Sequence, residues 1–264
     1  MKKQNNILEV IKNIIYLTFV CAFLNACTDQ EIYKPSTVKE GIPVKINFGI
    51  STPGMDKVTT RSLTEEGESQ VNDLYLLVFN KDGNNLKTRK FYSTNEISSS
   101  LGNKSKGTLV LETTSGESRI YAIANVETTE LNGTSIREEL DNVNSVNDLF
   151  NVTASLKDSN IERVQASLTM SGTFEQKGFS ESLQKQGYCT IPETNSTLDG
   201  KIYLSRLDSH ITFKISTASN VEFTPTSWQV KYIPLKSTVI AQNKSLIETT
   251  NDYADSKTYT GFGT

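Results

Sequence analysis

The clearest pattern along the chain is a strict alternation of apolar and other residues over positions 44–50. Successive side chains of a strand point to opposite faces of a sheet. Alternation therefore predicts a strand with one face against a core and the other against water. The residues expected to face the core are Val44, Ile46, Phe48 and Ile50.

Two kinds of pattern predict the strands that follow. Residues 74–79 are apolar throughout, which is typical of a strand buried on both faces, and turn residues follow them. Residues 108–113 alternate, residues 119–125 are largely apolar, and Gly116 lies between them. These last two segments could form a hairpin.

Three further strands are predicted later in the chain, at residues 168–172, 203–215 and 228–233. In the segment 203–215, Tyr203 and Leu207 share the parity expected to face the core. His210 lies on the other parity and is expected at the surface.

Two short helices are predicted in the middle of the chain. Ser135-Ile136-Arg137-Glu138 is a capping-box pattern, in which the hydroxyl and the carboxylate satisfy the first free backbone N–H groups. Ile136 and Leu140 then share one face. Ser145-Val146-Asn147-Asp148 begins a second helix, whose apolar residues are Val146, Leu149 and Phe150. Helices this short between strands are expected to cover one end of a sheet.

The N-terminus predicts a secretory signal peptide over residues 1–26. A basic start precedes an apolar run from Ile14 to Phe23, which is too short to span a bilayer. Leu24-Asn25-Ala26-Cys27 resembles the lipobox of bacterial lipoproteins, in which the cysteine is acylated and becomes the first residue. Cys27 is therefore the predicted lipidation site, because several acyl chains on one residue anchor a protein stably.

The composition argues against most kinds of enzyme catalysis. The 264 residues carry 27 Lys and Arg against 30 Asp and Glu, so no basic excess points to nucleic acid. The chain has one His and three Cys, at positions 21, 27 and 189. We therefore expect no metal site, no cofactor and no His-based catalysis, and the chain is predicted not to be an enzyme. Cys189 is expected to be a small buried apolar residue.

A polar stretch, residues 51–70, separates the first two predicted strands and is expected to be a long exposed loop. It contains Thr59-Thr60-Arg61-Ser62. An arginine in an exposed loop is a site where a trypsin-like protease would cut. On spacing alone, however, an ordinary surface arginine is the favoured interpretation of Arg61.

Seven segments, each weak alone, stand in a particular order. They are the lipobox at Cys27, the strand 44–50, Thr59-Thr60-Arg61, Val71-Asn72-Asp73-Leu74-Tyr75-Leu76-Leu77-Val78-Phe79-Asn80, Tyr121-Ala122-Ile123-Ala124-Asn125, Met170-Ser171-Gly172 and Ile202-Tyr203-Leu204-Ser205-Arg206-Leu207-Asp208-Ser209-His210-Ile211. Their order and spacing resemble the fimbrillin superfamily, the subunits of type V pili in Bacteroides-type bacteria.

The resemblance implies a mainly β fold, a transthyretin-like antiparallel β-sandwich with short helices between strands. It also implies a structural subunit of a cell-surface pilus (fimbria), exported as a lipoprotein to the cell outer membrane and supporting adhesion. In the family, an arginine-specific protease cuts after the first strand, and a strand from another subunit fills the vacated groove. Carried over, the cut bond is Arg61–Ser62 and the released strand is 44–50. The implied partners are other pilus subunits, the protease, and the membrane through the lipid on Cys27.

The predicted organisation has four parts: a signal peptide (1–26), a tether (27–41), an N-terminal fimbrillin-like β-sandwich (42–218) and a final segment (219–264). Family subunits usually have a second sandwich, for which the last part is too short. It is expected to be an incomplete second β segment, either the start of a second domain or a truncated C-terminal segment. The sequence identifies no donor strand and leaves open a shaft, tip or anchor position.

The alternative function is a monomeric surface-anchored lipoprotein that binds a glycan or a host protein. Such a protein would keep its lipid and leave Arg61 intact. Carbohydrate sites favour exposed aromatic side chains, for which Trp228 and Tyr92 are the candidates. A secreted hydrolase is disfavoured because the sequence lacks a catalytic set.

Overall fold

The computed structural model describes residues 37–52, 70–101, 106–127, 130–131, 134–155, 168–207, 220–222, 224–242, 253–256 and 258–260. These residues belong to the unit Ser36–Thr264, one of two into which the chain divides. No helix within these ranges is long and apolar enough to cross a membrane. The predicted signal peptide, the predicted sites at Cys27, Arg61 and Ser62, and the predicted surface residue His210 lie outside the described residues.

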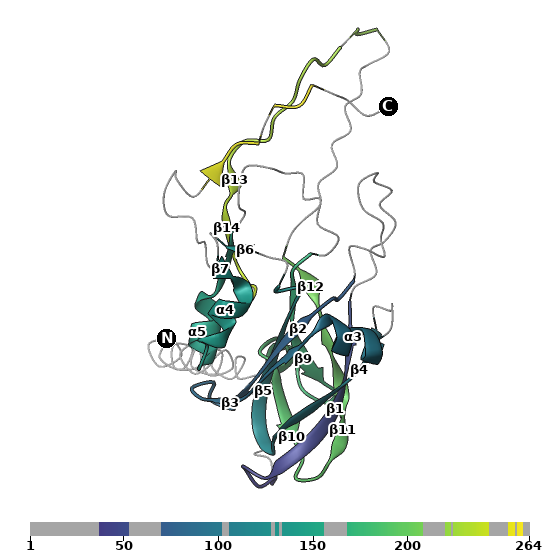
Figure 1. The fold of residues 1–264 in the computed structure, drawn as a ribbon, viewed down its shortest axis with the longest axis vertical. Helices are drawn as coiled ribbons and strands as arrows, with labels where there is room; N and C mark the ends of the chain where they lie inside the picture. Colours follow the sequence, from purple (N-terminus) through teal and green to yellow (C-terminus); the bar gives the residue numbers. More distant parts are fainter. Residues whose placement is uncertain are drawn as a thin grey trace, which may run out of the picture. The chain divides into compact units, whose positions relative to one another are not determined.

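The main feature is a nine-stranded sheet that folds over on itself into a β-sandwich (Figure 1), which confirms the predicted fold class. The strand order is β3-β2-β5-β9-β11-β1-β4, with β10 paired to β5 and β12 paired to β9. Every pair is antiparallel except β1 with β11. The bounds are β1 Pro43–Ser51, β2 Leu74–Asn80, β3 Leu86–Tyr92, β4 Lys106–Thr114, β5 Gly116–Ala124, β9 Met170–Gln176, β10 Tyr188–Ile191, β11 Ser196–Tyr203 and β12 Ser205–Arg206.

Strand β9 belongs to both layers of the sandwich. Its first part, Met170–Thr173, pairs with β5, and its second part, Phe174–Gln176, pairs with β11. Gly172 permits this crossing, because a Cβ atom there would lie 2.1 Å from the carbonyl oxygen of Tyr203. The strand therefore joins two layers that share one core.

The outermost strands, β3 and β4, are joined by side chains. The hydroxyl of Thr88 donates to Oγ1 of Thr113 at 2.7 Å, and the hydroxyl of Tyr92 donates to the carbonyl of Val110 at 2.8 Å. Tyr92 is 4% exposed and packs in the core between the layers. The suggestion that Tyr92 offers an exposed platform for a glycan is therefore wrong.

Two apolar clusters lie on opposite faces of β2. One fills the space between the layers, and the other covers the outer face of β2 and β5 beneath α4 (Ile136–Asp141) and α5 (Val146–Asn151). Leu76 packs in the first cluster and Leu77 in the second. The prediction that this strand is buried on both faces is confirmed.

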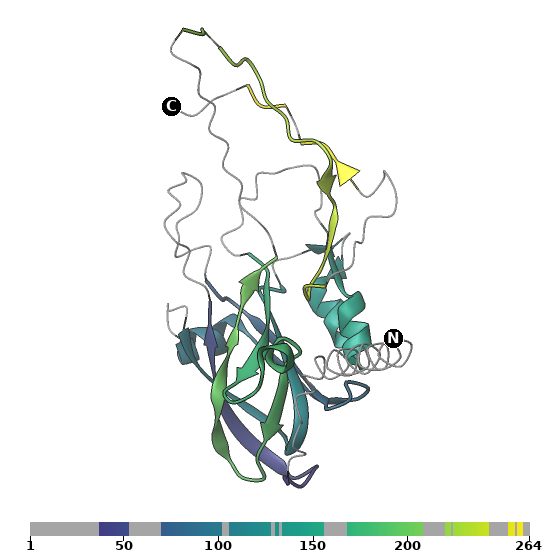
Figure 2. The same ribbon diagram turned by 180° about the vertical axis from the view of Figure 1, so that it is seen from behind.

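Both predicted helices exist, but they cover a face of the sheet and not an end of it (Figure 2). Ile136 and Leu140 of α4 are buried, and Ser145 caps α5 by accepting from the N–H of Asp148 at 3.1 Å. The expected position at a sheet end is wrong because the outer face of β2 and β5 is itself apolar and needs cover. The residues of that face are Tyr75, Leu77, Phe79, Tyr121 and Ile123. Two further helices are α3 (Thr94–Leu101) and α6 (Glu181–Lys185).

Strands β4 and β5 do not form the predicted hairpin. β4 pairs with β1, whereas β5 pairs with β2 and β9. The chain passes from one layer to the other at Ser115 and Gly116, whose φ of +112° favours glycine. The apolar residues of the two strands thus face one core from opposite layers, among them Leu109 on β4 and Ala122 on β5.

The predicted strand 203–215 begins differently from the prediction. β11 ends at Tyr203, which is 49% exposed, while Ile202 and Leu204 are buried. The short strand β12 then continues along β9, with which β11 also pairs, and lies opposite Ser171 and Met170. The expectation that Tyr203 faces the core is therefore wrong, because the core-facing residues here have the opposite parity. Leu207 is partly buried and packs against the cluster beneath α4 and α5.

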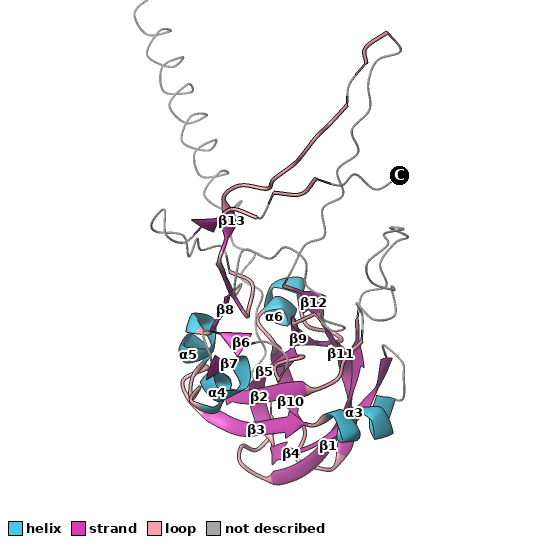
Figure 3. Cartoon of the chain, turned by 45° about the horizontal axis from the view of Figure 1, so that its top comes forward, coloured by secondary structure: helices cyan, strands magenta, loops and turns pink. Residues whose placement is uncertain are grey.

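The remaining strands are short pairs (Figure 3). Trp228 forms only a single bridge with Tyr259 in place of a strand over 228–233, and the two rings stack at 4.2 Å. Val239 and Ile240 are buried in the cluster beneath α4 and α5. The pairs are β6 (Glu130–Leu131) with β7 (Thr134–Ser135), β8 (Thr153–Ser155) with β14 (Lys236–Thr238), and β13 (Ile233–Pro234) with β15 (Tyr253–Ala254).

Candidate functional site

Strand β1 contains the predicted strand 44–50, whose release the family resemblance implies. Val44, Ile46, Phe48 and Ile50 are at most 6% exposed and lie in the core between the layers. Lys45 points the other way, is exposed, and forms an ion pair with Glu112 at 3.0 Å. The alternating sequence thus produces a strand with one fully buried face.

β1 is an internal strand with a neighbour on each side. β4 runs antiparallel to it along the whole strand, from Pro43 opposite Thr114 to Ser51 opposite Lys106. β11 pairs with it in parallel on the other side. The N–H of Leu204 donates to the carbonyl of Ser51 at 2.9 Å and extends this pairing to the end of β1. Removal of β1 would leave two unpaired backbone edges facing each other.

The groove that β1 fills is lined by apolar side chains. They come from the neighbouring strands and from the opposite layer, and each is at most 5% exposed: Leu109, Leu111, Leu198, Ile202, Leu76 and Val78. Without β1 these side chains would lose their cover. The groove therefore fits another strand with the same alternation, which would supply both main-chain hydrogen bonds and apolar side chains.

A polar network around Glu40 holds the chain just before β1. The carboxylate of Glu40 accepts from Nζ of Lys87 at 2.9 Å and from the N–H of Glu117 at 2.8 Å. The hydroxyl of Ser115 donates to the carbonyl of Lys39 at 2.6 Å. The end of the predicted tether is therefore fixed on the turn between β4 and β5. No spacing in the sequence marks this contact, because Glu40 and Lys87 are 47 residues apart.

A second polar network fixes residues 70–73, just before β2. Nδ2 of Asn125 donates to the carbonyl of Gln70 at 3.0 Å, and its Oδ1 accepts from the N–H of Asn72 at 2.8 Å. Asp73 is 1% exposed and accepts from the N–H of Val126 at 2.7 Å. Burial raises the pKa of Asp73 above its ordinary value. The segment that contains Arg61 thus runs between two ends that are both held on the fold.

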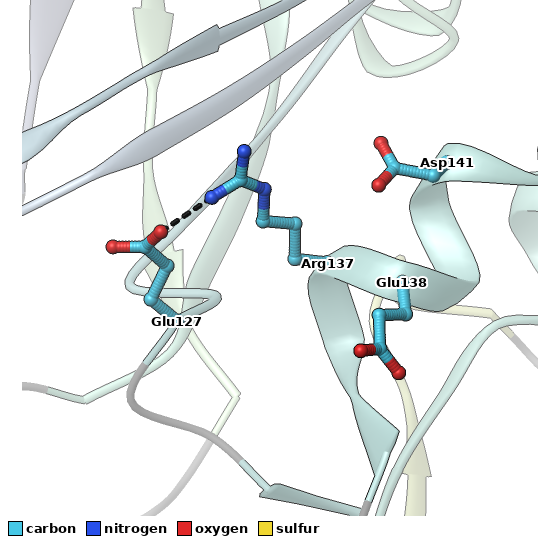
Figure 4. A pocket seen from close by; sticks show the side chains of 4 residues that line it. All are labelled: Glu127, Arg137, Glu138 and Asp141. Carbon is cyan, nitrogen blue, oxygen red and sulfur yellow. Dashed lines mark hydrogen bonds and ion pairs between the residues drawn. The ribbon is translucent and has the colours of Figure 1, made fainter.

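A surface depression at α4 is lined by Glu127, Arg137, Glu138 and Asp141 (Figure 4). Arg137 forms an ion pair with Glu127 at 2.5 Å, and its guanidinium lies 3.7 Å from the ring centre of Phe91. These contacts fasten α4 to the sheet and provide no evident reactive group. Within the described ranges, no group of three or more His, Cys, Asp or Glu residues could hold a metal ion.

Two other residues singled out by the sequence lie within the described structure. Cys189 is 1% exposed, so its predicted burial is confirmed, and burial raises the pKa of its thiol to about 12. A thiol in this state is a poor nucleophile. Trp228 is 37% exposed and is stacked on Tyr259.

A protein-family model matches most of the chain. The model is described as major fimbrial subunit protein (FimA), and it matches residues 42–224. Among curated proteins, no match to the sequence was found.

Several solved structures are similar at low sequence identity. A candidate cell adhesion protein from Parabacteroides distasonis is 15% identical, with a TM-score of 0.46 over 85% of this chain and 66% of that one. A fimbrial assembly protein from the same species is 16% identical, with a TM-score of 0.46 over 82% and 71%. The C-terminally truncated tip fimbrial protein Mfa3 from Porphyromonas gingivalis is 15% identical, with a TM-score of 0.36 over 62% and 48%. The chain spans less than two thirds of the length of the cell adhesion protein and of Mfa3.

Proposed function

Because the chain belongs to the family of major fimbrial subunit proteins (FimA), we propose that it is a structural subunit of a cell-surface fimbria that supports adhesion. It is exported as a lipoprotein acylated on Cys27 and is attached to the outer membrane by that lipid. An arginine-specific protease then cuts between Arg61 and Ser62. β1 leaves, and a strand from another subunit fills its groove.

The observation that best supports this proposal is the position of β1. It is an internal strand of the sandwich, yet it is the first strand of the described fold, and the segment 53–69 that contains Arg61 follows it. A single cut in that segment removes the covalent link between β1 and the rest of the sandwich. Any later internal strand would need two cuts to be released.

The energetics of the groove also support replacement by another strand. Burial of a large apolar side chain stabilises a fold by about 1.5–3 kcal/mol, so the four buried residues of β1 contribute on the order of 6–12 kcal/mol. The whole stability of a typical domain is about 5–15 kcal/mol. A subunit with an empty groove is therefore unstable, and a donor strand that restores these contacts binds tightly.

The test is the N-terminus of the protein isolated from its native cell surface, determined by mass spectrometry. We expect fibres in which the chain begins at Ser62 and carries no lipid. Arg61→Gln should leave an uncut chain that begins at acylated Cys27, whereas Lys57→Gln, a matched change in the same segment, should be processed normally. Wild-type fibres whose chains retain the Arg61–Ser62 bond would contradict the release of β1.

A further inference from the structure

Lys87 is a largely buried cation at one end of the groove. Its side chain is 12% exposed. Nζ donates to the carbonyls of Ser115 at 3.2 Å and Glu117 at 3.3 Å, and to the hydroxyl of Ser118 at 3.1 Å. These three partners are neutral. Within the described part of the chain, Glu40 supplies the one carboxylate in ion-pair contact with Lys87, at 2.9 Å.

The groups around the Glu40 side chain supply one hydrogen-bond donor for each oxygen of its carboxylate. One oxygen accepts from Nζ of Lys87 and the other from the N–H of Glu117 at 2.8 Å. Gly116 provides the space, because a Cβ atom there would lie 2.0 Å from the carboxylate. A cation and a backbone N–H thus bind the two oxygens, and Gly116 leaves room for them because it has no side chain. Such charge-assisted hydrogen bonds are among the stronger ones in proteins.

All three groups of this site belong to the part of the chain that follows Arg61, whereas Glu40 precedes β1. Release of β1 therefore removes the carboxylate, and a donor strand that covered the site again without a carboxylate would leave Lys87 as a largely buried charge without a counter-ion, which is unfavourable. From this geometry, and resting on the proposed strand replacement, we infer that the donor strand of a second subunit must carry an acidic residue in place of Glu40. That residue lies four positions before the first core-facing residue, the equivalent of Val44.

The same site fixes the register of the donor strand. Alternation alone does not distinguish two registers that differ by two residues, because both place the same parity in the core. A slip of two residues moves the acidic side chain by about 6.6 Å along the strand, out of reach of Lys87. The matching donor segment thus has an acidic residue, followed four, six, eight and ten positions later by apolar residues.

The experiment measures strand exchange with peptides. The full chain is kept in mild detergent and is cut at Arg61 with an arginine-specific protease. It carries Arg163→Lys, so that Arg163 is not a second cleavage site. The cleaved segment that contains β1 is removed under denaturing conditions, the chain is refolded with fluorescent peptides of residues 37–52, and their uptake is followed by fluorescence anisotropy. Three peptides are compared: the native sequence, Glu40→Gln, and Lys45→Gln, which changes an exposed charge on the same strand.

We expect the Glu40→Gln peptide to bind about tenfold more weakly than the native peptide, as for the loss of a hydrogen bond to a charged group. The Lys45→Gln peptide should bind within about threefold of the native one, because both side chains of its ion pair are exposed and such pairs contribute little. The Glu40 side chain is also 59% exposed, but its partner Lys87 is only 12% exposed. A chain carrying Lys87→Met should lose the preference for the acidic peptide, which locates the selectivity at this cation.

Two outcomes would overturn the inference, and they are distinguishable. Equal binding of the native and Glu40→Gln peptides would exclude the carboxylate requirement while leaving strand replacement intact. Failure of the native peptide to enter the cut chain would exclude strand replacement itself, and the inference with it.

Discussion

Replacement of Phe48 by alanine should destabilise the uncut chain by about 3–5 kcal/mol, the range for removal of a buried aromatic ring. Phe48 is 1% exposed and lies in the core between the layers. Its backbone pairs with Leu109 of β4, and the residues on either side of it, Asn47 and Gly49, pair with β11. The strand cannot move inward to close the cavity, so the loss should not be relieved by local collapse.

The assay is urea unfolding of the uncut chain followed by circular dichroism, in which a shift of the midpoint at constant slope reports a change in stability. Lys45→Ala is the control, because this side chain is 53% exposed and its ion pair with Glu112 is exposed too. Such a pair contributes at most about 1 kcal/mol. A loss below about 1 kcal/mol for Phe48→Ala, the size expected of an ordinary substitution, would refute the assignment of β1 as a core strand.

Three further predictions concern other parts of the fold. Gly172→Ala should cost about 1–3 kcal/mol through overpacking against the carbonyl of Tyr203, and an unchanged melting temperature would contradict this close crossing. Cys189, whose thiol pKa is raised to about 12 by burial, should react with thiol reagents only after denaturation, and rapid labelling of Cys189 itself in the folded chain, located by peptide mass spectrometry, would disprove this. The side chain of Lys90 lowers the pKa of Glu96 from 4.5 to about 2, so the stabilisation by Glu96 is present above pH 4.5 and is lost as the pH falls to about 2. A carboxyl NMR titration should show this midpoint, and Lys90→Gln should move it upward.

Local patterns in the sequence were sufficient to predict several elements. Alternation located β1 and its buried face, and the unbroken apolar run identified β2 as buried on both sides. The segment Ser145-Val146-Asn147-Asp148 located the start of α5, where the structure shows a capping box between Ser145 and Asp148. Each of these signals acts within a few residues, through side-chain parity or a hydrogen bond to a nearby backbone N–H.

The partners of the strands could not be predicted in this way. β4 and β5 are adjacent in sequence but lie in different layers, because the turn at Ser115 and Gly116 is held by contacts from residues 39–42. β3 was missed because it is an outermost strand whose central residues, Lys87 to Lys90, are polar. A strand that packs against the core only in part needs no alternation.

The same difference between local patterns and long-range contacts applies to the residues of the candidate site. The four core-facing residues of β1 could be identified from parity alone. Glu40 and Lys87 could not, because their contact joins distant segments and requires the fold to exist first. Cys27, Arg61 and Ser62 lie outside the described residues, and their roles stay predictions.

The place of β1 between two neighbours has a mechanical consequence. Tension along the axis of a strand held in this way loads both rows of hydrogen bonds in shear, so many bonds must break together. An outermost strand pulled at right angles would instead unzip one bond at a time. Rupture under force is governed by the barrier to unfolding and not by the equilibrium stability. In a fibre assembled as proposed, each donor strand would resist flow and traction at every subunit junction.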